Sequence, residues 1–154
     1  MESENLFIGL DPGSSSGAFG IIDGNGKYVN CGDIPTVDGR VDAAGLFALI
    51  KYPYPARPTY IAVENVHTMP GQGISSSGKF MRAAGSIEAT AQLLSTHMVL
   101  VTPQKWKKHF KLIGTEKKDS LVLARKIWPD APLNLVKHHG RADALLMALW
   151  MKDS

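Results

Sequence analysis

Short apolar runs separated by turn residues predict a protein of alternating strands and helices. Residues 6–11, 17–23 and 27–34 form three such runs, and the Asp-Gly-Asn-Gly turn at 23–26 predicts that they fold back as an antiparallel meander. Further strands are predicted at 59–64 and 98–101. Because helical patterns alternate with the later strands, the sequence indicates an α/β fold.

The helical patterns carry recognisable start and stop signals. Asp42 is the predicted N-cap of a helix over 42–51, which the prolines of the segment 52–58 end. Thr102 and Thr115 are the predicted caps of two later helices, the first with Pro103 at its first position. Helices are also predicted over 79–95 and 139–151, and residues 67–78 are predicted to be a glycine- and serine-rich loop.

The composition is that of a globular protein, with 154 residues, 44% of them hydrophobic and 20% charged. This length favours a single domain over residues 1–154. No apolar run reaches the length of about 18–20 residues that spans a bilayer, and the acidic start resembles neither a secretory signal nor a transit peptide. The lone Cys31 excludes an internal disulfide and a cysteine-built zinc site, so we expect a cytoplasmic protein.

Positive charge is concentrated in one part of the chain. Residues 98–141 contain ten Lys and Arg and three acidic residues, whereas the whole chain has a net charge of only +3. This asymmetry predicts a face that binds a polyanion, with a solvated helical surface as the alternative.

Two of the predicted strands end in a carboxylate, Asp11 and Glu64. Ligands of α/β sheets gather at such strand ends, and two neighbouring strands would bring the two carboxylates together. His139 and Asp143 lie on one face of the last helix, whose apolar positions should pack on the sheet and direct this end toward the same point. Clustered carboxylates repel one another unless protonated or neutralised, which predicts a hard divalent cation such as Mg²⁺.

Three segments in this order resemble the RuvC-type Holliday-junction resolvases of the ribonuclease H-like superfamily. They are IGLDPGSSSGAFGII, IAVENVH and HHGRADALLMA, and the phage branch of the family is the most similar in size and in the segment VTPQKWKK. The resemblance implies a mixed five-stranded sheet flanked by helices, a homodimer without a nucleotide cofactor, and Mg²⁺-dependent nicking of branched DNA, with Mn²⁺ as a substitute.

The resemblance assigns the acidic metal ligands to Asp11, Glu64 and Asp143. The family has a fourth acidic or histidine ligand three or four residues before the last Asp; the nearer position is Gly140 here, so His139 is the expected substitute and His138 its rival. In this hypothesis Asp11 bridges two ions roughly 4 Å apart and a metal-activated water attacks the phosphorus, leaving a 5′-phosphate. His139 as general base is the alternative.

Candidate DNA contacts lie in the basic segment and beside the acidic motifs. They are Lys105, Lys107, Lys108, Lys117, Lys118, Ser16, His67 and Phe80. For His67 the alternative is an ordinary surface histidine, and for Phe80 a core or dimer contact. Part of the apolar face of the helix over 79–95 is the candidate dimer interface.

Other classes of protein account for part of this pattern. An ATPase of the actin and sugar-kinase type also begins with a strand, an Asp and a glycine-serine turn, but it needs a second lobe. A non-catalytic nucleic-acid-binding module explains the basic segment and leaves the three carboxylates unexplained. The residues themselves do not distinguish DNA from RNA as substrate.

Overall fold

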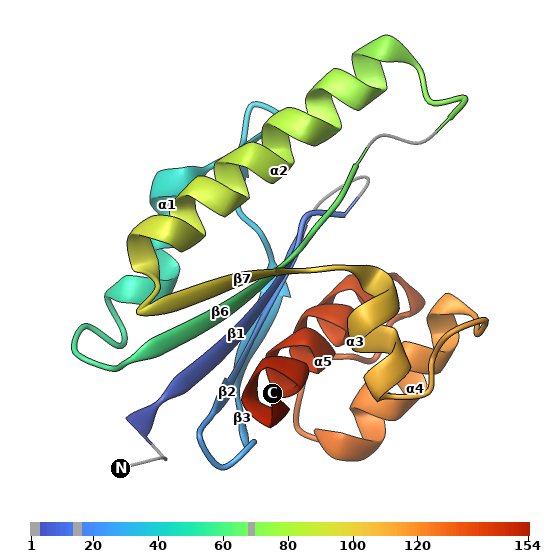
Figure 1. Ribbon diagram of the computed structural model, residues 1–154. Coiled ribbons are helices and arrows are strands. Elements are labelled where there is room, and N and C mark those ends of the chain that lie inside the picture. Colours follow the sequence, from blue (N-terminus) through green and yellow to red (C-terminus); the bar gives the residue numbers. More distant parts are fainter. Residues whose placement is uncertain (1–3, 14–16, 68–69) are drawn as a thin grey trace.

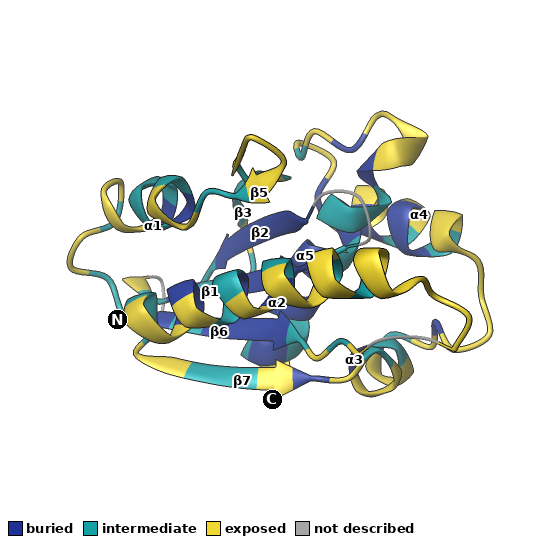
Figure 2. Ribbon diagram, turned by 90° about the horizontal axis from the view of Figure 1, so that it is seen from above, coloured by how far each residue is buried: buried dark blue, intermediate teal, exposed yellow. Residues whose placement is uncertain are grey.

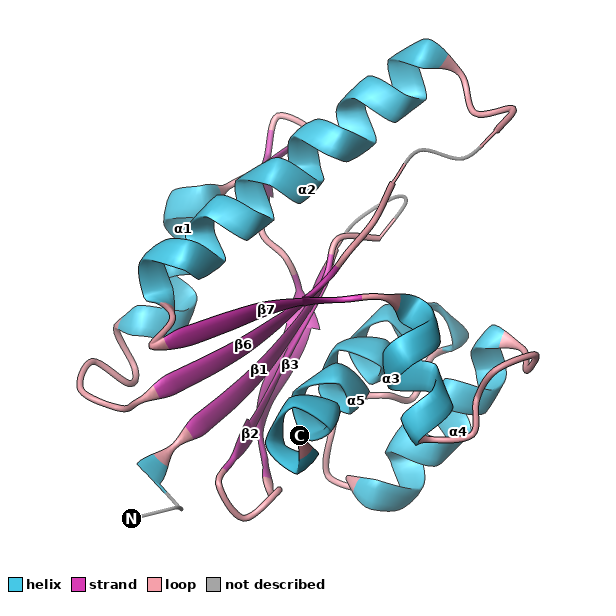
Figure 3. Ribbon diagram, viewed as in Figure 1, coloured by secondary structure: helices cyan, strands magenta, loops and turns pink. Residues whose placement is uncertain are grey.

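A five-stranded mixed sheet forms the centre of the computed structural model, which describes residues 4–13, 17–67 and 70–154 (Figures 1 and 3). Its strands are β1 (Leu6–Asp11), β2 (Ala18–Asp23), β3 (Tyr28–Asp33), β6 (Thr59–Glu64) and β7 (His97–Val101). They lie in the order β3-β2-β1-β6-β7, antiparallel from β3 to β1 and parallel from β1 to β7. The predicted α/β class and the mixed sheet with its opening meander are confirmed.

Helices cover both faces of this sheet (Figure 1). One face carries α1 (Ala43–Lys51) and α2 (Ile74–Leu94), and the other carries α3 (Pro103–His109), α4 (Lys117–Ile127) and α5 (His139–Asp153), which a short 3₁₀ turn, η2 (Val136–His138), precedes. Each face has its own apolar core, because alternate residues of the central strands point to opposite sides. Along the described residues, no helix is both long and apolar enough to cross a membrane. The single domain over residues 1–154 stays a prediction.

Side chains at the helix starts explain where the helices begin. Asp42 Oδ1 accepts a hydrogen bond from the Gly45 N–H at 2.9 Å, and Thr102 Oγ1 accepts one from the Lys105 N–H at 3.3 Å, so both predicted caps are confirmed. The predicted cap Thr115 is wrong. Its hydroxyl donates back to the Leu112 carbonyl at 2.6 Å, and α4 is capped one residue later, at Glu116.

The segment between β6 and α2 is shorter than predicted. Helix α2 begins at Ile74 rather than near residue 79, and the Ser77 N–H already donates to the Gly73 carbonyl at 2.9 Å. Serine and glycine are weak helix formers, so this part of the chain did not predict a helix. In the structure the helix of the later, apolar residues continues back through these serines and glycines to Ile74. The buried residues of α2 all lie from Ala84 onward, so its N-terminal half projects beyond the sheet (Figures 1 and 2).

A small hairpin between β3 and α1 was not predicted. Strands β4 (Thr36–Val37) and β5 (Arg40–Val41) pair across a tight turn in which Asp38 and Gly39 have φ values of 52° and 75°. An Asp-Gly pair favours such a turn, but the flanking strands are too short to give a periodic pattern.

Candidate functional site

The ends of β1 and β6 bring two carboxylates to one edge of the sheet. The two strands are parallel neighbours, with Leu10 paired to Val63, so Asp11 and Glu64 follow at the next position of each strand. Asp11 is 8% exposed, and Glu64 is half-buried. The Gly13 N–H donates to Asp11 Oδ1 at 3.0 Å and holds that carboxylate beside the strand end.

Helix α5 brings the third carboxylate, Asp143, to the same edge because it lies unusually close to the sheet. A Cβ at Gly9 of β1 would lie 1.9 Å from the Ala144 carbonyl oxygen, and one at Gly20 of β2 would lie 2.6 Å from the Leu145 nitrogen. No side chain fits at either position. The two glycines therefore allow the backbone of α5 to pack directly on β1 and β2, next to Asp143.

Gly140, one turn earlier on α5, faces Asp11. A Cβ built on it would lie 3.8 Å from Asp11 Oδ2 and 3.4 Å from the Ala18 Cβ. Gly140 occupies the position at which the family pattern has an acidic or histidine ligand, and this position lies directly beside Asp11. Glycine has no side chain that could bind a metal there, so the space beside Asp11 stays open.

The three carboxylates perturb one another. Burial, followed by the charge of Asp143, raises the pKa of Asp11 to about 7. Burial and the charge of Asp11 raise the pKa of Glu64 to about 7. Burial and the charge of Glu64 raise the pKa of Asp143 to about 6, although the Ser120 hydroxyl, as a hydrogen-bond partner, lowers it. Residues far apart in the sequence thus form one group of acids that is costly to ionise without a cation.

The chemistry of this group fits a hard divalent cation. The donors are carboxylate oxygens, which Mg²⁺ prefers, and Asp143 Oδ1 is buried with no hydrogen-bond partner among the described residues. The side chains are not preassembled as ligands: within the described ranges, no three His, Cys, Asp or Glu are arranged as a metal-holding group. The three acids are nevertheless close enough to interact electrostatically.

Trp106 contributes a contact that the sequence did not reveal. Its side chain is fully buried in the core, and its indole N–H donates to Glu64 Oε2 at 2.8 Å. This hydrogen bond lowers the pKa of Glu64 and fixes one of its oxygens. No local pattern marks this contact, because it depends on the pairing of β7 with β6: Trp106 is the fourth residue of α3, the helix that follows β7. Trp128 is likewise buried and Trp150 half-buried.

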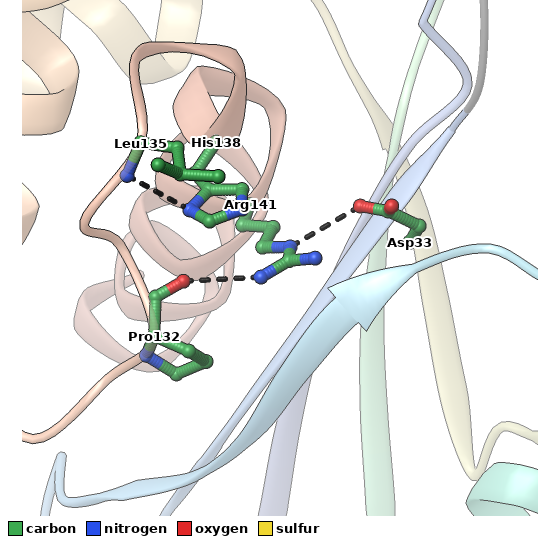
Figure 4. A network of polar contacts seen from close by, with 5 residues as sticks. All are labelled: Asp33, Pro132, Leu135, His138 and Arg141. Atoms are coloured by element: carbon green, nitrogen blue, oxygen red, sulfur yellow. Dashed lines mark hydrogen bonds and ion pairs between the residues drawn. The ribbon is translucent and has the colours of Figure 1, made fainter.

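The two histidines at the start of α5 have different surroundings. His138 is buried, and its Nδ1 accepts the Leu135 N–H at 3.1 Å (Figure 4). This hydrogen bond closes the η2 turn and occupies one ring nitrogen of His138, so the contact does not favour His138 as a metal ligand. His139 is half-buried, and burial and the charge of Lys117 lower its pKa, which favours the neutral ring that metal binding or proton transfer needs. Its place as fourth ligand stays a prediction.

Arg141 fixes this end of α5 to the sheet. Its Nε donates to Asp33 Oδ1 at 3.1 Å at the end of β3, and its guanidinium also donates to the Pro132 carbonyl at 3.1 Å (Figure 4). The start of α5 is thus held by polar contacts, and its later turns by the apolar core.

Two of the lysines predicted to contact DNA, Lys107 and Lys117, interact electrostatically with the carboxylates. The charge of Lys107 lowers the pKa of all three acids, and the charge of Lys117 lowers those of Asp11 and Asp143. The other lysines lie at the surface of the same layer: Lys105 lies 5.7 Å from the Trp150 ring centre, Lys108 is exposed, and Lys118 pairs with Glu116 at 3.2 Å.

The remaining predicted DNA contacts lie outside the basic segment 98–141, and one of them lies outside the described ranges. His67 is exposed three residues beyond Glu64, and Phe80 is half-buried on α2. Ser16 lies outside the described residues. Cys31 is a free cysteine buried in the core.

Known proteins that are similar to the chain include a Holliday junction resolvase and RuvC structures. No family model matches the chain. A chloroplastic Holliday junction resolvase of Chlamydomonas reinhardtii is 34% identical over 113 residues, which are 70% of this chain and 13% of that protein. The chain thus spans only a small part of the length of this relative.

Solved structures of RuvC from Thermus thermophilus superpose on nearly the whole chain. One, in complex with a Holliday junction substrate, has a TM-score of 0.65 and 15% identity, covering 94% of this chain and 90% of that one. Another has a TM-score of 0.63 and 19% identity, covering 94% and 91%. The chain therefore has the fold of RuvC, and the resemblance to RuvC-type Holliday-junction resolvases that its motifs indicated is confirmed.

Proposed function

We propose that the chain is a metal-dependent endonuclease that resolves four-way DNA junctions by paired nicks leaving 5′-phosphates. The observation that carries this proposal is the group of three carboxylates from β1, β6 and α5, each of which has a raised pKa. The RuvC fold around them supports the same reaction, since the similar proteins include a RuvC in complex with a Holliday junction substrate and a Holliday junction resolvase.

Asp11, Glu64 and Asp143 would hold the metal, with His139 as fourth ligand or general base. When bound, one or two Mg²⁺ ions, or Mn²⁺, would activate a water for attack and stabilise the leaving 3′ oxygen. Trp106 keeps one oxygen of Glu64 engaged and so fixes how that carboxylate turns. Lys107, beside all three acids, would pair with the scissile phosphate when it enters.

A homodimer would present two such sites to the two scissile strands of a junction, which a two-fold axis relates. The projecting half of α2 supports this arrangement. Ile74, Gly78, Met81 and Gly85 follow helical spacing along one face, on which Ile74 is 94% and Met81 40% exposed. Beyond the helix's own neighbouring atoms, nothing in the described part of the chain lies within 4 Å of a Cβ built on either glycine. Two copies of this face could pack closely. Light scattering at micromolar concentration tests this: a dimer supports the proposal, and a monomer contradicts it.

The reaction itself is tested with labelled four-way junction, flap and linear duplex in Mg²⁺ and in EDTA. We expect paired nicks in the junction in Mg²⁺ only, ligatable by DNA ligase because the products carry 5′-phosphates. Asp11→Asn should abolish nicking and keep junction binding, whereas the exposed Asp130→Asn serves as a matched control that keeps both. Nicking by Asp11→Asn would contradict the metal assignment; binding without nicking by the wild type would favour a non-catalytic module. We also propose that the reaction takes place in the cytoplasm, on DNA rather than RNA.

A further inference from the structure

A groove of about 600 Å³ lies on the α2 side of the sheet, next to the loop that follows Asp11. One wall is the β4–β5 hairpin and the other is the projecting half of α2, which Figure 2 shows with its largely exposed surface. Pro12 and Gly13, the residues directly after Asp11, line its inner end. The groove therefore opens onto the loop whose N–H holds Asp11.

Positive charge lines this groove from both walls. Arg40 comes from the hairpin, and Lys79 and Arg82 come from α2; all three are exposed. In the part of the chain that the structure describes, none of them forms an ion pair with a carboxylate. Asp38 is the acidic residue among the groove's lining residues. Three unpaired cations on two facing walls suit an anion that occupies the space between them.

Basic residues thus lie on both sides of the sheet edge at which β1 ends in Asp11. Lys107 of α3 and Lys117 of α4 influence the acids from one side of this edge. The groove lies on the other side, under α2. Figure 1 shows that α2 and the pair α3 and α4 cover opposite faces of the sheet. A single phosphate would need only one of these surfaces. A path of positive charge that continues past the reacting centre on both sides suits a polyanion with regularly spaced phosphates.

We propose that this groove binds the sugar–phosphate backbone of the nucleic-acid substrate next to the scissile phosphate, with Arg40, Lys79 and Arg82 as phosphate contacts. This inference rests on the proposed nuclease function and extends its substrate site to a surface outside the basic segment 98–141. Phe80, half-buried in the same wall, offers a ring on which an unpaired base can stack.

The test measures junction binding as a function of salt. A variant with Arg40→Gln, Lys79→Gln and Arg82→Gln is compared with a control that loses equal charge away from the groove, Lys27→Gln, Lys51→Gln and Lys152→Gln. Both are made in the Asp11→Asn background and studied in EDTA by fluorescence anisotropy, so that no cleavage interferes. Thermal unfolding verifies that both variants fold.

We expect the groove variant to bind roughly tenfold or more weakly at 0.1 M salt, with a log–log salt slope shallower by about 2–3, since each phosphate contact contributes about 0.7–0.9. The control should change both quantities much less. Equal affinities and slopes for the two variants would overturn the inference. If the two variants behave alike while the wild type still nicks junctions in Mg²⁺, the groove inference fails and the proposed nuclease function stands. If the wild type neither binds nor nicks junctions, the proposed function fails as well.

Discussion

Neutralising one buried carboxylate should stabilise the metal-free protein. The pKa of Asp11 is raised from 3.8 to about 7, chiefly by burial and by Asp143, so the folded state holds a proton there that the unfolded chain releases. The contribution of Asp11 to stability is therefore greatest at low pH and falls as the pH rises through this range, because the folded state binds more protons at this group than the unfolded state. Asp11→Asn removes this penalty, and the amide oxygen can still accept the Gly13 N–H.

The magnitude follows from the shift. About three pKa units correspond to roughly 4 kcal/mol at pH 8. Asp143 shares part of this cost, since the two acids raise each other's ionisation cost, so we expect a gain of about 2–4 kcal/mol. For a chain of this size, that gain raises the Tm by roughly 4–16 °C. At pH 4, where Asp11 is protonated in the folded wild type, the difference should nearly vanish.

The assay is thermal and urea unfolding of both proteins in EDTA from pH 4 to pH 8 at constant ionic strength. Mg²⁺ added at pH 8 should stabilise the wild type and have little effect on Asp11→Asn. Asp130→Asn, which removes an exposed charge, should follow the wild type at every pH. A stability difference between wild type and Asp11→Asn that does not grow with pH, or that favours the wild type at pH 8, would refute the reasoning.

Three further substitutions test the surroundings of the acids. Trp106→Phe removes the N–H that Glu64 accepts, so nicking should fall tenfold or more while the junction Kd stays within a few-fold, and a proportional loss of both would contradict the positioning role. Gly9→Ala places a Cβ against the Ala144 carbonyl oxygen and should cost about 3 kcal/mol or more in urea unfolding; an unchanged midpoint would show that α5 does not lie so close. Lys107→Gln removes a charge that lowers all three carboxyl pKa values, so metal-free stability should decrease more at pH 8 than at pH 5, and an equal loss at both would argue against that interaction.

Local patterns determined most of the elements and the order of the acidic motifs. The strands ending at Asp11 and Glu64 were predictable because each is a short apolar run that stops at a carboxylate. The caps Asp42 and Thr102 were predictable because capping depends on residues three positions apart. The predicted start of α2 was too late, because its first residues have low helix propensity. The predicted cap of α4 was one residue too early, because two residues that can cap a helix, Thr115 and Glu116, are adjacent.

The sequence alone therefore indicated which three acids the fold brings together, because each is marked by its own strand end or helix face. Only the tertiary structure decided how closely they meet, that Trp106 binds Glu64, and that Arg40, Lys79 and Arg82 line one groove. These relations join residues tens of positions apart, and their free energy comes from burial and from through-space charge. Burial and these charge interactions arise only when α5 packs on the glycines of the sheet and brings distant parts of the chain together.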